Sequence, residues 1–83
     1  MILRDAADKV GRDFIAATYR GHDEFRVTVA RNVILDCLGE SVEPDFTRKV
    51  MENKLFSSAS RGVIKKMTPH LLELVGKTME LAK

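Results

Sequence analysis

The chain has 83 residues, of which 45% are hydrophobic and 31% are charged, and its formal net charge is +2. This length corresponds to a single domain, residues 1–83, with enough apolar residues to form a core. No apolar run approaches the roughly 18 residues of a membrane-spanning helix, and a lone cysteine excludes an internal disulfide. Because the charged N-terminus also lacks the apolar region of a signal peptide, we expect a cytoplasmic protein that is not associated with a membrane.

The first predicted helix covers residues 3–19. Its apolar residues recur every three or four positions and form one stripe, made of Leu3, Ala6, Val10, Phe14 and Ala17. Gly11 lowers the helix propensity by about 1 kcal/mol relative to alanine, which indicates the close approach of another helix. Gly21 is expected to end the helix in the left-handed conformation.

The second predicted helix covers residues 24–38, with Asp23 as its N-cap and Gly39 as its end. It is apolar around most of its circumference, so we expect it to lie at the centre of a bundle. Within it, Cys37 is predicted to be a small core residue rather than a reactive thiolate. A strand over residues 25–29 is the alternative, because β-branched residues are frequent there.

Three further helices are predicted after residue 43. Pro44 suits the first turn of a helix over residues 44–54. A corner at Phe56-Ser57-Ser58 then leads to a helix over residues 59–67, with Ser57 or Ser58 as its N-cap. Thr68 and Pro69 predict the start of a last helix over residues 69–82. The expected fold is therefore all-α, a compact bundle of about five short helices.

The second and last helices carry more apolar surface than a small core readily covers. Large exposed apolar patches usually mark sites of association, so the sequence predicts either a homodimer or a protein-partner interface on the first, second or last helix. The alternative is a compact bundle that buries all of these residues.

The residue types needed for catalysis do not form a recognisable set. His22, His70, Cys37 and the serines show no spacing that places a base beside a nucleophile. There is no paired-ligand spacing for a metal and no glycine-rich phosphate loop. We therefore expect a protein that is not an enzyme and that has neither a metal nor a cofactor.

Residues 47–67 hold six basic residues against one acidic residue, which gives this segment a net charge of +5. Read as a helix-turn-helix, its second helix would enter the major groove of DNA and its lysines would contact phosphates. Gly62 inside that helix weakens this interpretation. The other interpretation is a positive face that orients an acidic protein partner. For either partner the predicted contact residues are Arg48, Lys49, Lys54, Arg61, Lys65 and Lys66.

Residues 32–57 resemble the small phage anti-sigma proteins of the AsiA type. The matching pieces are Asn32-Val33-Ile34 before Leu38-Gly39, then Val42, and Arg48-Lys49 before Phe56-Ser57. Pro44, Pro69 and the apolar last helix depart from the pattern of that family. The resemblance implies a helical regulator of transcription that binds the C-terminal domain of the primary sigma factor of RNA polymerase, blocks recognition of one promoter element, and also self-dimerises. The positions nearest to the family's contact region are Val10, Phe14, Ile15, Arg20, Phe25, Val33 and Ile34.

Overall fold

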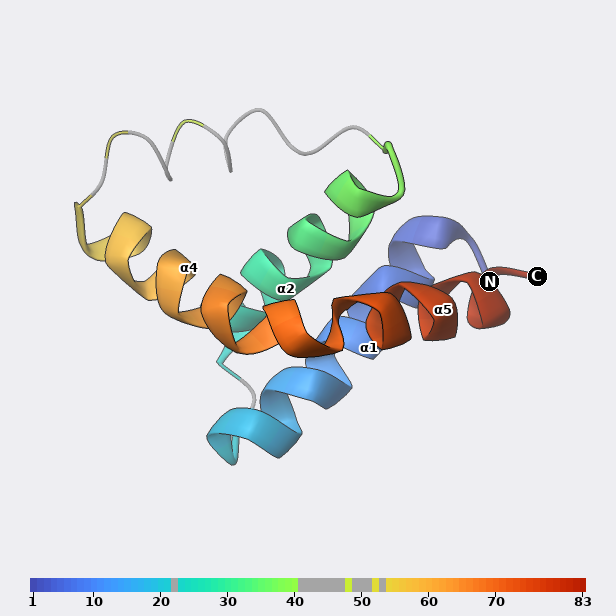
Figure 1. Ribbon diagram of the computed structural model, residues 1–83, viewed down its shortest axis with the longest axis horizontal. Coiled ribbons are helices and arrows are strands. Elements are labelled where there is room, and N and C mark those ends of the chain that lie inside the picture. Colours follow the sequence, from blue (N-terminus) through green and yellow to red (C-terminus); the bar gives the residue numbers. More distant parts are fainter. Residues whose placement is uncertain (22, 41–47, 49–51, 53) are drawn as a thin grey trace.

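The computed structural model describes residues 1–21, 23–40, 48, 52 and 54–83, with the side chains of residues 54–56 left out (Figure 1). Its elements are α1 (Leu3–Tyr19), α2 (Glu24–Cys37), α4 (Lys54–Met67), a 3-10 turn (Thr68–His70) and α5 (Leu71–Ala82). The described residues contain helices and no strand, which confirms the all-α class and excludes a strand over residues 25–29.

The described helices form three continuous segments rather than about five, because α4, the 3-10 turn and α5 follow one another without a break. The predicted helix over residues 44–54 lies largely outside the described residues. The predicted corner at Phe56-Ser57-Ser58 is wrong, since α4 runs straight through it. Tertiary packing explains the difference: Ser60, Val63 and Met67 are buried at intervals of three and four residues and hold one face of α4 against α2.

The start predicted at Thr68 also differs from the structure. The Thr68 hydroxyl donates a hydrogen bond of 2.8 Å to the carbonyl oxygen of Ile64, so it continues the preceding helix instead of capping a new one. Pro69 lies within the 3-10 turn, and α5 begins two residues later than predicted. The chain consequently bends at residues 68–70, with α4 packed on α2 and α5 packed on α1.

The connection between α1 and α2 agrees with the prediction at Asp23 and differs from it at Gly21. The carboxylate of Asp23 accepts hydrogen bonds from the backbone N–H groups of Phe25, at 2.9 Å, and Arg26, at 3.3 Å, which confirms it as the N-cap. The left-handed residue after α1 is Arg20, with φ of 56°, and not Gly21. The helix ends at Tyr19 as predicted, but the left-handed cap comes one residue before the glycine.

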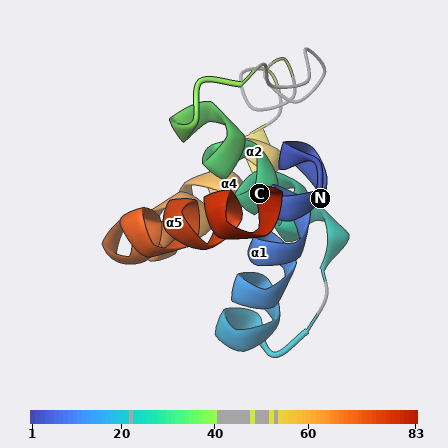
Figure 2. The ribbon, with the colours of Figure 1, turned by 90° about the vertical axis from the view of Figure 1, so that its right-hand side faces the viewer.

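The core lies where α1 and α2 pack together and is closed by α4 and α5. Gly11 is buried against α2, which confirms the predicted close approach. Cys37 is exposed, and the prediction that it belongs to the core is wrong, because it lies on the solvent side of the last turn of α2, whereas the neighbouring Leu38 packs against the core. The two chain termini lie at the same end of the molecule (Figure 2). The buried apolar residues of the core are Ala7, Val10, Ile15, Val27, Val29, Ala30, Ile34, Leu35, Val63, Met67 and Leu74.

Candidate functional site

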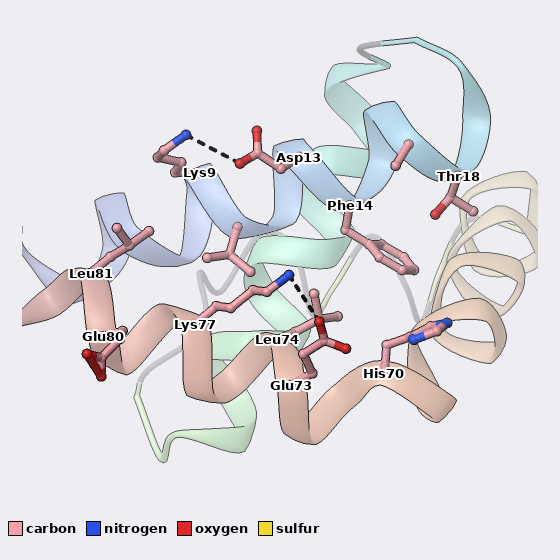
Figure 3. Close-up of a pocket in the computed structure, with 12 residues that line it drawn as sticks. Lys9, Asp13, Phe14, Thr18, His70, Glu73, Leu74, Lys77, Glu80 and Leu81 are labelled. Atoms are coloured by element: carbon pink, nitrogen blue, oxygen red, sulfur yellow. Dashed lines mark hydrogen bonds and ion pairs between the residues drawn. The ribbon is translucent and has the colours of Figure 1, made fainter.

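A groove of about 710 Å³ runs between α1 and α5, which lie side by side in opposite directions (Figure 3). Its floor is apolar. Val10 of α1 and Leu74 of α5 are each only 5% exposed, and they join the groove to the core. The lining consists of Lys9, Val10, Asp13, Phe14, Ala17 and Thr18 from α1, and His70, Glu73, Leu74, Lys77, Glu80 and Leu81 from the second wall.

The two ends of the groove differ. At one end the rings of Phe14 and His70 meet at 5.9 Å between centroids, tilted by 53°. At the other end Leu81 is 37% exposed and keeps an apolar side chain in contact with solvent. Ala17, three residues beyond Phe14 on α1, leaves the α1 wall open near the His70 end, because its side chain is short and exposed. The groove therefore offers apolar surface along its length.

Charged side chains line both rims and are paired along their own helices. Lys9 lies 3.3 Å from Asp13 on α1, and Lys77 lies 3.1 Å from Glu73 on α5. All four side chains are more than half exposed, between 54% and 71%. Exposed pairs of this kind contribute about 0.3–0.5 kcal/mol to stability. A ligand can therefore replace either partner of such a pair at little cost.

Below the groove, a network of ion pairs fixes α1 on α2. Both terminal nitrogens of Arg12 donate to the Glu24 carboxylate, one of them at 3.2 Å, and Arg12 also lies 3.4 Å from Asp8. The hydrogen bonds that Arg12 donates to the Glu24 carboxylate raise the pKa of Arg12 above its ordinary value. Asp8 in turn accepts from Arg31 of α2 at 3.2 Å. The α1 wall of the groove is thus held in place from behind.

The residues predicted to contact a protein partner fall into three places. Val10 and Phe14 lie in the groove. Ile15 and Ile34 are completely buried, so they support the fold and offer no surface to a partner. The others lie at the edge of the core or beyond it: Phe25 and Val33 are partly buried against it, and Arg20 is exposed after α1.

The basic residues of segment 47–67 are described in part. Arg61, Lys65 and Lys66 are exposed on α4, and Arg48 is exposed as well. Lys49 and the side chain of Lys54 lie outside the described residues.

This basic surface extends onto α1 and α2 through Tyr19. The ring of Tyr19 carries Lys66 at 5.2 Å from its centroid and Arg26 at 4.2 Å. Such distances are typical of cation–π contacts. Neither Tyr19 nor Arg26 was predicted as a contact residue, because both join this basic surface only through the folding of the chain.

The α5 wall of the groove was also missed. Glu73 and Lys77 are four residues apart, a spacing that predicts an ion pair on an exposed helix face. This spacing, beside the apolar Leu74 and Leu81, could have indicated from the sequence that α5 has one charged edge facing solvent.

Residues 1–21, 23–40 and 54–83 contain no group of three or more His, Cys, Asp or Glu side chains arranged to hold a metal ion. His22 lies outside the described residues. None of the described helices has the length and apolar character needed to cross a bilayer. Comparisons with protein-family models, curated proteins and solved structures find no match to this chain.

Proposed function

We propose that this chain is a small non-enzymatic regulatory protein that acts by binding another protein in the groove between α1 and α5. The observation that carries the proposal is the groove itself, which has a volume of about 710 Å³, an apolar floor and two antiparallel helices as its walls. An amphipathic helix of a partner fits such a groove, since its apolar side chains at intervals of three and four residues find anchor positions. Phe14 and Leu81 supply these positions toward the two ends of the groove, above the buried Leu74.

The rims support the same mode of binding. Each rim carries both signs, with Lys9 and Asp13 on α1 and Lys77 and Glu73 on α5, and these exposed pairs exchange readily for charges on the partner. Such rim charges set the orientation and the association rate of a bound helix more than its affinity. The apolar floor would supply most of the affinity.

For the identity of the partner, we propose the C-terminal domain of a primary sigma factor of RNA polymerase. The support is the resemblance of residues 32–57 to anti-sigma proteins of the AsiA type. In this proposal the chain occupies a surface of the sigma factor that otherwise recognises one promoter element. The result would be repression of the promoters that depend on that element.

A pull-down tests the proposal with one variant and one matched control. Ala17→Arg places a long side chain at the His70 end of the groove, and the new arginine stands four residues after Asp13, a favourable helical spacing. Ser58→Arg adds the same charge at an exposed position of α4 away from the groove. We expect the wild type and Ser58→Arg to retain RNA polymerase with its sigma factor at low salt, and Ala17→Arg to lose retention at least about tenfold, a change of about 1.4 kcal/mol.

The outcomes separate the two parts of the proposal. Absence of retention by the wild type at low salt rejects the sigma factor as the partner. Equal retention by Ala17→Arg and Ser58→Arg rejects the groove as the binding site, whichever protein is bound.

DNA binding by α4 is the second candidate function. Its support is the set of exposed cations Arg61, Lys65 and Lys66, extended by Arg26 across the ring of Tyr19. Without a turn at residues 56–58, the contact would be made by one side of a continuous helix. Fluorescence anisotropy with duplex DNA should then show binding that weakens steeply with salt and disappears in Lys65→Glu/Lys66→Glu. Undetectable binding at low salt rejects this candidate.

A further inference from the structure

The side of α5 that faces away from the groove carries an unpartnered apolar stripe. Leu72 is 92% exposed and Met79 is 55% exposed. They are two helical turns apart and therefore lie on one face. Val75 and Gly76 lie between them on the same side, whereas the groove residues Lys77 and Leu81 lie roughly 140° or more around the helix from Leu72. The stripe consists of Leu72, Val75, Gly76 and Met79.

Gly76 is the feature of the stripe that points to another helix. A glycine inside a helix is unfavourable relative to alanine and is usually explained by close packing. Gly11 shows this use within the fold, because a Cβ atom there would lie 3.2 Å from the Cβ of Ala30. At Gly76 a Cβ atom would have no neighbour within 4 Å. Gly62 is equally open, but it stands beside Arg61 on a charged face.

We propose that a second copy of this chain covers the stripe, with the two α5 helices antiparallel about a twofold axis. Leu72 and Met79 are equally far from a point between Val75 and Gly76. A twofold axis at that point places Leu72 against Met79 of the second copy, and Val75 against Gly76 of the second copy. Leu72 of each copy then contacts Met79 of the other, so the same contact is made twice, as a twofold interface requires. Each valine enters the space over a glycine of the other copy.

The charges beside the stripe favour a second copy over a charged partner. Glu73 is paired with Lys77 at 3.1 Å, and Glu80 is paired with Lys83 at 3.3 Å. Each acid on α5 therefore has a lysine within its own helix or next to it. Two such neutral edges meet without like-charge repulsion, and they give no attraction to a strongly acidic or basic surface. The dimer leaves the apolar floor of the groove between α1 and α5 open, with Glu73 and Glu80 bordering both the stripe and the groove.

Sedimentation equilibrium of the full chain tests the dimer with a pair of glycine variants. Wild type should show a monomer–dimer equilibrium between about 1 and 100 µM. Gly62→Ala and Gly76→Ala should both raise the melting temperature of the dilute monomer, because both sites are open and alanine favours the helix. Only Gly76→Ala should also raise the dimer dissociation constant, by at least about tenfold. A monomeric wild type, or equal dimerisation of the two variants, overturns the proposal.

A second pair of variants removes apolar surface with glutamine, which is a good helix former. Leu72→Gln/Met79→Gln should be monomeric over the same range of concentration. Ile2→Gln/Ile64→Gln, which changes two exposed apolar residues elsewhere, should dimerise like the wild type. Dimers of the first variant, or their loss in the second, contradict the assignment of the interface to α5.

Disulfide formation tests the antiparallel arrangement. The exposed Cys37 is first replaced by serine, and Leu72→Cys and Met79→Cys are then made separately in that background. Oxidation of an equal mixture should yield mainly the disulfide between position 72 of one copy and position 79 of the other. A predominance of disulfides between identical positions rejects the proposed twofold axis.

Discussion

Gly11 of α1 lies directly against Ala30 of α2: a Cβ atom on Gly11 would be 3.2 Å from the Cβ of Ala30 and 3.1 Å from the backbone nitrogen of Arg31. The missing side chain sets the separation of the two helices, which carry most of the core. The ion pair between Asp8 and Arg31, at 3.2 Å, lies close to this contact and fixes its register. The α1 wall of the groove therefore depends on a glycine on its opposite side.

Gly11→Ala tests this contact. Alanine improves the helix by about 1 kcal/mol, but the new methyl group meets backbone atoms that move little, and overpacking costs about 1–3 kcal/mol. We expect the free energy of unfolding to fall by about 1 kcal/mol in urea titrations. Gly62→Ala, at an open site, should raise it by up to about 1 kcal/mol. Equal stabilisation by both variants would contradict the close packing of α1 on α2.

The ion pairs of α1 should differ in their effect on stability. Asp8 joins Arg12 and Arg31 with a side chain that is 30% exposed, whereas Asp13 pairs with the exposed Lys9 and is 71% exposed. Thermal unfolding should show a loss of about 1–3 kcal/mol for Asp8→Asn. Asp13→Asn should change stability by less than about 0.5 kcal/mol. Each variant removes one negative charge, so similar losses would argue against a specific role of the network that joins α1 to α2.

Two methionines allow a matched test of the core. Met67 is 1% exposed in the core, and Met79 is 55% exposed on the outer side of α5. Met67→Ala should cost about 2–5 kcal/mol, because it leaves a cavity where α4 meets α2. Met79→Ala, measured in dilute solution, should stay within about 0.5 kcal/mol of the wild type. Comparable losses would mean that α5 packs differently on the bundle.

Cys37 should react in the native state. It is the only cysteine of the chain, and it is exposed at the end of α2. We expect a thiol reagent to label it without unfolding, at a rate close to that in denaturant. Protection that disappears only on unfolding would place Cys37 in the core, as the apolar character of α2 alone had suggested.

Local sequence patterns predicted the parts of the fold that depend on neighbouring residues. Asp23 and the stripe of α1 define the first two helices, because capping and periodicity act within a few residues. The continuity of α4 through Ser57 and Ser58 was not predictable in this way. It depends on the burial of Val63 and Met67 against a helix distant in the sequence.

The candidate site shows the same division. Val10 and Phe14 were predicted as contact residues, but Glu73, Lys77 and Leu81 were not, because the groove exists only where α5 folds back on α1. The exposed bases of α4 were visible in the sequence, while their extension to Tyr19 and Arg26 required the packing of three helices.

Nuclear magnetic resonance gives the most direct test of the groove between α1 and α5 as the site that binds a protein. The C-terminal domain of the primary sigma factor would be titrated into the labelled chain, with Ala17→Arg in parallel. We predict saturable binding by the wild type, with the largest shift changes at Phe14, Lys77 and Leu81, and loss of these changes in Ala17→Arg. The absence of any shift change, or changes centred on Arg61 of α4 that persist in Ala17→Arg, would contradict it.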